Sequence, residues 1–174
     1  QLIPLKKHDV LVEAVALLSS DQRAQLEVRI YGASTTDYAR AIALRIEKAG
    51  LADLFCWMGF FGSQADIYSD LDVVVAPAVG EAFGLTVLEA GGWELPVVAA
   101  RSGGFTETVV DGETGLLVAP DDPDDLARAL RSLMDPAERK RLGCNARQHV
   151  GERFSVSAMG RNFIDALTEI GLEA

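Results

Sequence analysis

Short apolar segments alternate with longer segments of helical periodicity along this chain, and the alternation constrains the fold more than any other feature. Five segments are predicted to be strands because they are short, apolar and bounded by Gly or Pro. These segments are LEVRIYG, LFCWMG, LDVVVAP, PVVAA and GLLVAP. Strands that alternate with helices are typical of a parallel sheet. We therefore expect an α/β fold with a Rossmann-like parallel sheet sandwiched by helices.

The helical segments carry recognisable stripes and caps. In residues 121–135, Asp122 is expected to cap a helix that has Pro123 in its first turn. The acidic DDPDD run therefore indicates a helix start rather than a metal site. Other helices are predicted for HDVLVEAVALLSS, TTDYARAIALRIEKAG, ADIYSD, a short segment after Gly104, and the chain from Pro136 onward, which is helical twice with a break near RFSVS.

Composition limits the possible partners. With 174 residues and 49% hydrophobic content, the chain is predicted to form one domain, 1–174, with a full core. The formal net charge of −10 argues against a nucleic-acid surface and against a basic membrane-binding face. An anionic ligand would therefore need a local basic site.

The cysteine and hydropathy patterns indicate a soluble, cytoplasmic protein. Cys56 and Cys144 have no CxxC spacing that would suggest zinc or a redox pair. His8 and His149 lack partners at metal or catalytic spacing and are interpreted as surface or packing residues. The sequence has no apolar run long enough for a transmembrane helix. Its first segment, QLIPLKK, is short for an opening strand, so the chain is expected to start inside a larger protein.

The segment VGEAFGLTVLEA carries two glutamates with seven residues between them, Glu81 and Glu89. It follows the predicted strand LDVVVAP, and ligands of open parallel sheets collect beyond the carboxyl ends of the strands. Gly84 is expected to open a helix whose first amides suit a phosphate. Thr86 and Glu89 should then share one helix face. Leu85 and Leu88 are expected to turn toward the core.

Carboxylates repel a phosphate, so hydroxyl groups are their plausible targets. A ligand with phosphates in the middle and hydroxyls at both ends is a nucleotide-sugar. On this interpretation Glu81 accepts from the sugar, Glu89 accepts from the ribose, and the amides of 83–85 hold the sugar and the distal phosphate. Spacing alone leaves another interpretation open, in which Glu81 is a solvated loop charge and Glu89 an exposed helix residue.

The segments EAFGLTVLEA and LPVVAARSGGFTETVVDGETGLLVAP resemble the E-x7-E region of the retaining glycosyltransferases of family four, which have the two-domain GT-B fold. The resemblance extends to KKHDVLVEAV, VRIYGAS and FCWMGFFGSQADIYSDLDVVVAPAVGE. It covers nearly the whole chain but only the C-terminal, donor-nucleotide domain of such an enzyme. The N-terminal acceptor domain is absent from this chain.

The resemblance implies roles for individual residues. Lys6 would contact the donor diphosphate, Glu81 the transferred sugar and Glu89 the ribose hydroxyls. Gly103 and Gly104 match the Gly-Gly of the family, but the sequence favours a turn as their role. The amides of Phe83, Gly84 and Leu85 would lie near the sugar and phosphate. Weaker correspondences concern a glycine turn after the first predicted strand and a loop beside the nucleobase: Gly32, Met58, Gly59 and Phe60.

The sequence departs from the family pattern near its start. Gln1 stands where an arginine usually precedes the lysine, so half of the usual cationic clamp is absent or altered. Lys7 replaces the usual glycine and either supplies a neighbouring charge or points to solvent.

The resemblance implies retaining transfer of a hexose from a UDP-, GDP- or ADP-sugar to an acceptor hydroxyl, without a metal or other cofactor. The isolated domain would bind the nucleotide and perform little transfer. Membrane contact, at the inner membrane, would belong to the absent domain. Two alternatives stay open: a non-catalytic nucleotide-binding or assembly module, and a related GT-B epimerase or phosphorylase domain.

Overall fold

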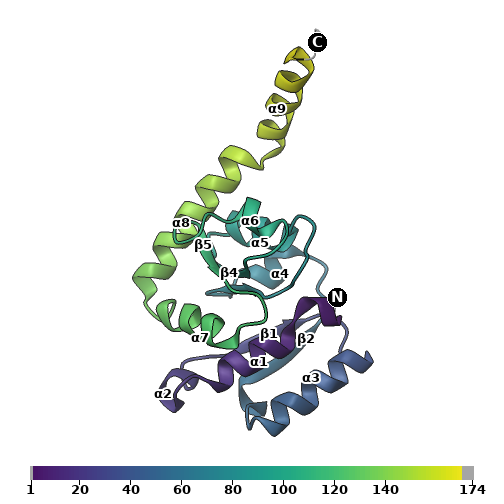
Figure 1. The fold of residues 1–174 in the computed structure, drawn as a ribbon, viewed down its shortest axis with the longest axis vertical. Coiled ribbons are helices and arrows are strands. Elements are labelled where there is room, and N and C mark those ends of the chain that lie inside the picture. Colours follow the sequence, from purple (N-terminus) through teal and green to yellow (C-terminus); the bar gives the residue numbers. More distant parts are fainter. Residues whose placement is uncertain (1, 170–174) are drawn as a thin grey trace.

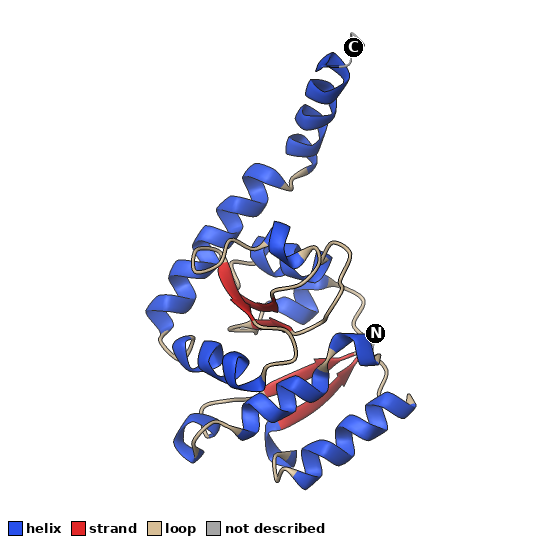
Figure 2. Cartoon of the chain, viewed as in Figure 1, coloured by secondary structure: helices blue, strands red, loops and turns tan. Residues whose placement is uncertain are grey.

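The computed structural model describes residues 2–169 and has the expected α/β architecture. Figure 1 shows a body of strands and helices from which the last helices extend as an arm. Figure 2 shows helices lying outside both groups of strands. No helix of the described part is long and apolar enough to cross a membrane.

All five predicted strands form, and their bounds lie within the predicted segments. The strands are β1 (Val28–Tyr31), β2 (Phe55–Gly59), β3 (Val74–Ala76), β4 (Val97–Ala100) and β5 (Gly115–Val118). The α-helices are α1 (His8–Ala16), α2 (Ser20–Arg23), α3 (Asp37–Lys48), α4 (Gln64–Tyr68), α5 (Leu85–Gly92), α6 (Phe105–Thr108), α7 (Pro123–Ser132), α8 (Pro136–Arg153) and α9 (Val156–Glu169). Two 3-10 turns, η1 (Pro4–Lys6) and η2 (Ala52–Leu54), complete the elements.

The strands form two parallel sheets, whereas the sequence predicted one. β1 pairs with β2, and β4 lies between β3 and β5. In residues 2–169 no strand joins β1 to β3, and the segment before α1 contains the turn η1. Residues 29–31 and 74–76 instead line a common cavity. One core cluster contains Ile30 of β1 together with Val98 of β4, so side-chain packing joins the two sheets.

Strand β4 shows how the core is divided between the two faces of its sheet. All four of its residues are buried, as expected when helices cover both faces of a parallel sheet. Val98 belongs to a core shared with α1, α3 and α7, whereas Val97 and Ala99 belong to a core shared with α4, α5 and α6. This alternation follows from the two-residue period of a strand.

The predicted helix ends are also present. The Asp122 side chain accepts a hydrogen bond from the Asp125 amide at 2.9 Å, and Pro123 occupies the first turn of α7. Thr36 caps α3 in the same way, by accepting from the Ala39 amide. The break between α8 and α9 falls within the predicted RFSVS segment.

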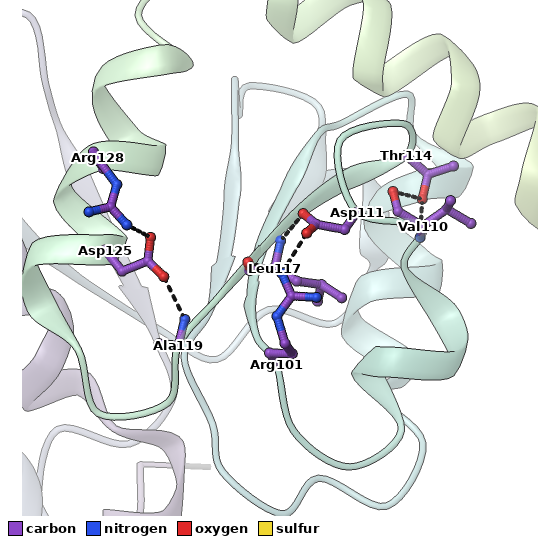
Figure 3. Close-up of polar contacts among 8 residues, drawn as sticks. All are labelled: Arg101, Val110, Asp111, Thr114, Leu117, Ala119, Asp125 and Arg128. Carbon is purple, nitrogen blue, oxygen red and sulfur yellow. Dashed lines mark hydrogen bonds and ion pairs between the residues drawn. The ribbon is translucent and has the colours of Figure 1, made fainter.

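Two carboxylates hold the end of β5 in place (Figure 3). Asp111 accepts from the Leu117 amide at 2.9 Å, and Asp125 accepts from the Ala119 amide at 2.8 Å. Burial alone would raise the pKa of Asp111, but the Leu117 amide and the Arg101 guanidinium outweigh it and lower that pKa. The end of β5 is therefore tied to the loop of Asp111 on one side and to the first turn of α7 on the other.

Replacing Ile42 by Ala should destabilise the fold by about 2–5 kcal/mol. Ile42 is 2% exposed on α3, so the shorter side chain leaves a cavity in the core. Leu44 lies on the same helix and is 56% exposed, and Leu44→Ala should change the free energy of unfolding by less than about 0.5 kcal/mol. Urea denaturation of both variants measures the difference, and equal losses would contradict this placement of α3.

Candidate active site

The start of α5 depends on a glycine with a left-handed backbone. Gly84 has a φ of +84°, and a Cβ at this position would lie 2.6 Å from a ring carbon of Phe105. No side chain caps this helix end, so its first amides have no partner from a capping residue. The prediction that Gly84 opens the helix is confirmed. These amides and the positive end of the helix dipole suit an anionic group.

The loop that carries Glu81 is held by the turn after β4. The amide of Gly104 donates to the carbonyl of Glu81 at 2.8 Å, and the amide of Gly80 donates to the hydroxyl of Ser102 at 3.0 Å. A Cβ on Gly103, whose φ is +55°, would lie 2.2 Å from the Glu81 carbonyl oxygen. Gly103 therefore acts as a turn and packing glycine that allows two backbones to touch.

Five of the sequence-predicted site residues line one cavity of about 390 Å³ at the carboxyl end of β3. They come from the N-terminal turn, the loop after β3 and the first turns of α5. The five are Lys6, Glu81, Gly84, Thr86 and Glu89. Residues 75 positions apart in the sequence thus meet at the place where ligands of parallel sheets bind.

Lys6 and Glu81 form an ion pair across this cavity. Their side chains are 34% and 24% exposed, so the pair is partly screened by water. The ion pair joins two of the three charged side chains that the sequence assigned to a ligand, and Glu89 is the third. Any anion that binds Lys6 must compete with the Glu81 carboxylate.

Glu89 has a partner that the sequence did not predict. The hydroxyl of Tyr68, at the end of α4, donates to Glu89 Oε2 at 2.8 Å. Tyr68 is 5% exposed and lines the same cavity. In the sequence, Tyr68 was distinguished only by lying in a short predicted helix between two strands, which does not mark it as a site residue. Tyr31 and His8 also border the cavity without having been assigned to it.

Phe83 and Leu85 do not line the cavity of Lys6 and Glu81. Both side chains line a second, larger cavity of about 860 Å³ between α5 and α9, together with Trp93 and Phe163. The expectation that Leu85 turns toward the core is wrong, since it is 64% exposed. The buried residues of α5 are instead Val87, Ala90 and Gly91. The amides of Phe83 and Leu85 still belong to the loop and helix start described above.

The remaining predicted residues lie at the ends of β1 and β2, outside the lining of both cavities. The Gly32 amide donates to the Gly59 carbonyl at 2.8 Å, which joins the two strand ends. Met58 is half-buried and Phe60 is 77% exposed. A role of these residues beside a nucleobase stays a prediction.

The departures from the family pattern at the start of the chain have different outcomes. Gln1 lies outside the described residues. Lys7 has a φ of +51°, the left-handed backbone that glycine adopts most easily. Its ammonium pairs with Asp121 at 2.6 Å, which raises the pKa of Lys7. Lys7 is therefore neither a free solvent charge nor part of the cavity lining.

His8 is a neutral group beside Lys6. Burial lowers the pKa of its imidazole to about 4, and the nearby Lys6 charge acts in the same direction. Its Nδ1 is buried and has no hydrogen-bond partner within residues 2–169. In that part of the chain no three His, Cys, Asp or Glu side chains gather in a way that could hold a metal ion.

The family described as "Glycosyl transferases group 1" matches residues 1–149. The chain belongs to this family. This finding confirms the resemblance inferred from EAFGLTVLEA and the segments around it. The residues that line the cavity of Lys6, Glu81 and Glu89 lie within the matched part of the chain.

Individual relatives agree with this family assignment. The D-inositol 3-phosphate glycosyltransferase of Geodermatophilus obscurus is 37% identical over 156 residues, which cover 85% of this chain and 34% of that protein. The chain thus spans about a third of the length of this curated relative.

Solved glycosyltransferase structures share the fold. Anabaena Alr3699/HepE, in complex with UDP and glucose, is 25% identical, with a TM-score of 0.86 over 97% of this chain and 46% of that chain. The C-terminal domain of a glycosyl transferase group 1 family protein, LpcC from Francisella tularensis, is also 25% identical. Its TM-score is 0.78, over 88% of this chain and 82% of that chain. The expected fold, half of a GT-B architecture, is confirmed by these neighbours.

Lowering the pH from 6.5 to 4 should destabilise the domain through His8. The unfolded imidazole takes up a proton near pH 6.5, whereas the folded one does so only near pH 4. Stability is therefore highest above pH 6.5 and falls across this window, by at most about 3 kcal/mol for a ring that is partly exposed. Urea denaturation at pH 7 and pH 4.5 should show a smaller loss in His8→Gln than in the wild type.

The comparison with His8→Gln is needed because burial also lowers the pKa of His149. His149→Gln serves as the matched variant, since it removes the other imidazole and leaves His8 in place. If His8→Gln and the wild type lost the same stability between the two pH values, His8 would not be the buried neutral group that the structure describes.

Proposed function

We propose that this domain binds the nucleotide-sugar donor of a retaining glycosyltransferase, which transfers a hexose to an acceptor hydroxyl. The observation that carries the proposal is one cavity that brings together Lys6, Glu81, Glu89 and the start of α5. A cation, a helix N-terminus and two carboxylates match the charges and hydroxyls of a nucleotide-sugar. The UDP complex of the Anabaena relative supports this ligand class.

The proposed ligand lies along the edge of the cavity with its diphosphate between Lys6 and the first amides of α5. Glu89 accepts from the ribose hydroxyls at one end, and Glu81 accepts from the sugar at the other. Binding of the diphosphate replaces the Lys6–Glu81 ion pair with a Lys6–phosphate contact. Glu81 is released by the same exchange and becomes free to accept from the sugar.

The proposed chemistry is departure of the diphosphate from the sugar. Negative charge grows on the leaving group while the sugar becomes oxocarbenium-like, so Lys6 and the α5 amides stabilise the transition state electrostatically. Glu81 orients the sugar and stabilises its developing positive charge. This arrangement needs no metal ion, because the cation and the amides meet the phosphate charge.

Other parts of the proposed enzyme lie beyond this chain. We place the acceptor site in an N-terminal domain that closes over the cavity during transfer. The described domain alone should bind nucleotide and transfer little. We place the protein in the cytoplasm, and any contact with the inner membrane belongs to the N-terminal domain.

Glu89→Ala should weaken binding of a nucleoside diphosphate by about 10- to 100-fold. The variant removes a carboxylate that accepts from ribose hydroxyls, a loss of about 1.5–3 kcal/mol. Calorimetric titration with UDP, GDP, ADP and dTDP measures the effect and identifies the base. Glu47→Ala is the control, because Glu47 is an exposed carboxylate on α3 that does not line either cavity. Equal affinity of all three proteins would contradict the proposal.

Glu81→Ala should weaken binding of the nucleotide-sugar more than binding of the bare diphosphate. The carboxylate meets only the sugar, and its removal also frees Lys6 from an ion pair that competes with phosphate. Titration of the variant with UDP and UDP-glucose, or with the matching pair for the base that binds, gives the ratio of the two affinities. A ratio equal to that of the wild type would place the sugar elsewhere.

A further inference from the structure

Tyr68 and Glu89 come from different helices and meet at the wall of the donor cavity. Tyr68 ends α4, Glu89 lies in α5, and the phenol oxygen is 2.8 Å from Glu89 Oε2. Tyr68 is 5% exposed, so surrounding side chains fix the position of its ring. The hydroxyl therefore presents a donor at a fixed place.

The direction of this hydrogen bond is also fixed. Burial raises the pKa of Tyr68, and the hydrogen bond to Glu89 raises it further. The phenol thus keeps its proton and donates, and Glu89 accepts. In the described part of the chain no other group donates to the Glu89 side chain. Oxygen Oε1 and the second lone pair of Oε2 are left for a ligand.

Glu89 borders both of the cavities described above. One of them holds Lys6 and Glu81, and the other is lined mainly by apolar groups of α5 and α9. A glutamate side chain has several rotamers, so the carboxylate could face either cavity. Tyr68 lines only the first of the two. The hydrogen bond from the Tyr68 hydroxyl therefore holds the Glu89 carboxylate toward the cavity of Lys6 and Glu81.

We propose that Tyr68 is a positioning residue that holds the Glu89 carboxylate in the donor cavity and so makes the site selective for a ribose with free hydroxyls. This inference rests on the proposed function, because it assigns a ribose to Glu89. A carboxylate that is already oriented loses less rotamer freedom on binding a diol than a freely rotating carboxylate does. Without the tyrosine hydroxyl, the protein must order Glu89 at the moment of binding.

Calorimetric titration of Tyr68→Phe tests this inference. The ligands are UDP, GDP and ADP, each with its 2′,3′-dideoxy counterpart. The variant should bind the best ribonucleotide about 10-fold more weakly than the wild type does, since it loses the orientation of a charged acceptor. Its affinity for the dideoxy form should stay within about 2-fold. The preference for ribose therefore falls in Tyr68→Phe, a change that a merely structural tyrosine would not cause.

Tyr31→Phe is the matched control, because the Tyr31 hydroxyl lines the same cavity but donates to the carbonyl of Ile67 at 3.3 Å. It should keep the wild-type preference for ribose. In a Glu89→Ala background, Tyr68→Phe should have no further effect on binding, because the tyrosine acts through Glu89.

Three results would overturn the inference. Tyr68→Phe could keep the wild-type preference for ribose, or it could lose affinity equally for both ligand forms, which would indicate a structural role. In either case the proposed function stands if the wild type binds a ribonucleotide more tightly than its 2′,3′-dideoxy counterpart. If the wild type binds none of the nucleotides, the proposed function fails and this inference fails with it.

Discussion

The site depends on close contact between two backbones, the turn after β4 and the loop that carries Glu81. Gly103 and Gly104 have no side chains, so the Gly104 amide can reach the Glu81 carbonyl at 2.8 Å. Gly84 then turns the same loop into α5 with a left-handed backbone. The positions of Glu81, the helix amides and Glu89 all follow from this short stretch. Three glycines thus determine the positions of the residues that are proposed to bind the donor.

Much of this arrangement could be predicted from local patterns. The Asp122 cap, the strand bounds and the start of α5 at Gly84 each follow from a residue type that favours one backbone conformation. Gathering of Lys6, Glu81 and Glu89 in one cavity followed from the resemblance and from the rule that ligands collect at the carboxyl ends of strands. What could not be predicted depends on tertiary contacts. Leu85 is exposed while Val87 on the same helix is buried, and the strands form two sheets where one was expected.

Tyr68 was missed for a related reason. A tyrosine in a short helix has no spacing that marks it as functional, and its role appears only when α4 packs beside α5. The sequence predicted the carboxylate but could not predict the group that orients it. Orientation is a property of pairs that lie far apart in sequence, here 21 residues. Supporting residues of a site are therefore harder to predict than the residues that would touch the ligand.

The charge balance explains why a strongly acidic chain can still bind an anion. A net charge of −10 opposes a diphosphate at long range, but screening by salt confines that effect to about 10 Å at moderate ionic strength. The charged groups that line the cavity are Lys6, the two carboxylates and Arg29, which pairs with Glu27, and the α5 amides add a partial positive charge. Glu81 neutralises Lys6 until a ligand arrives and then meets the sugar in the proposed complex, so neither charge is left unpaired in either state. Because all these groups lie within one domain, donor binding can be measured apart from transfer.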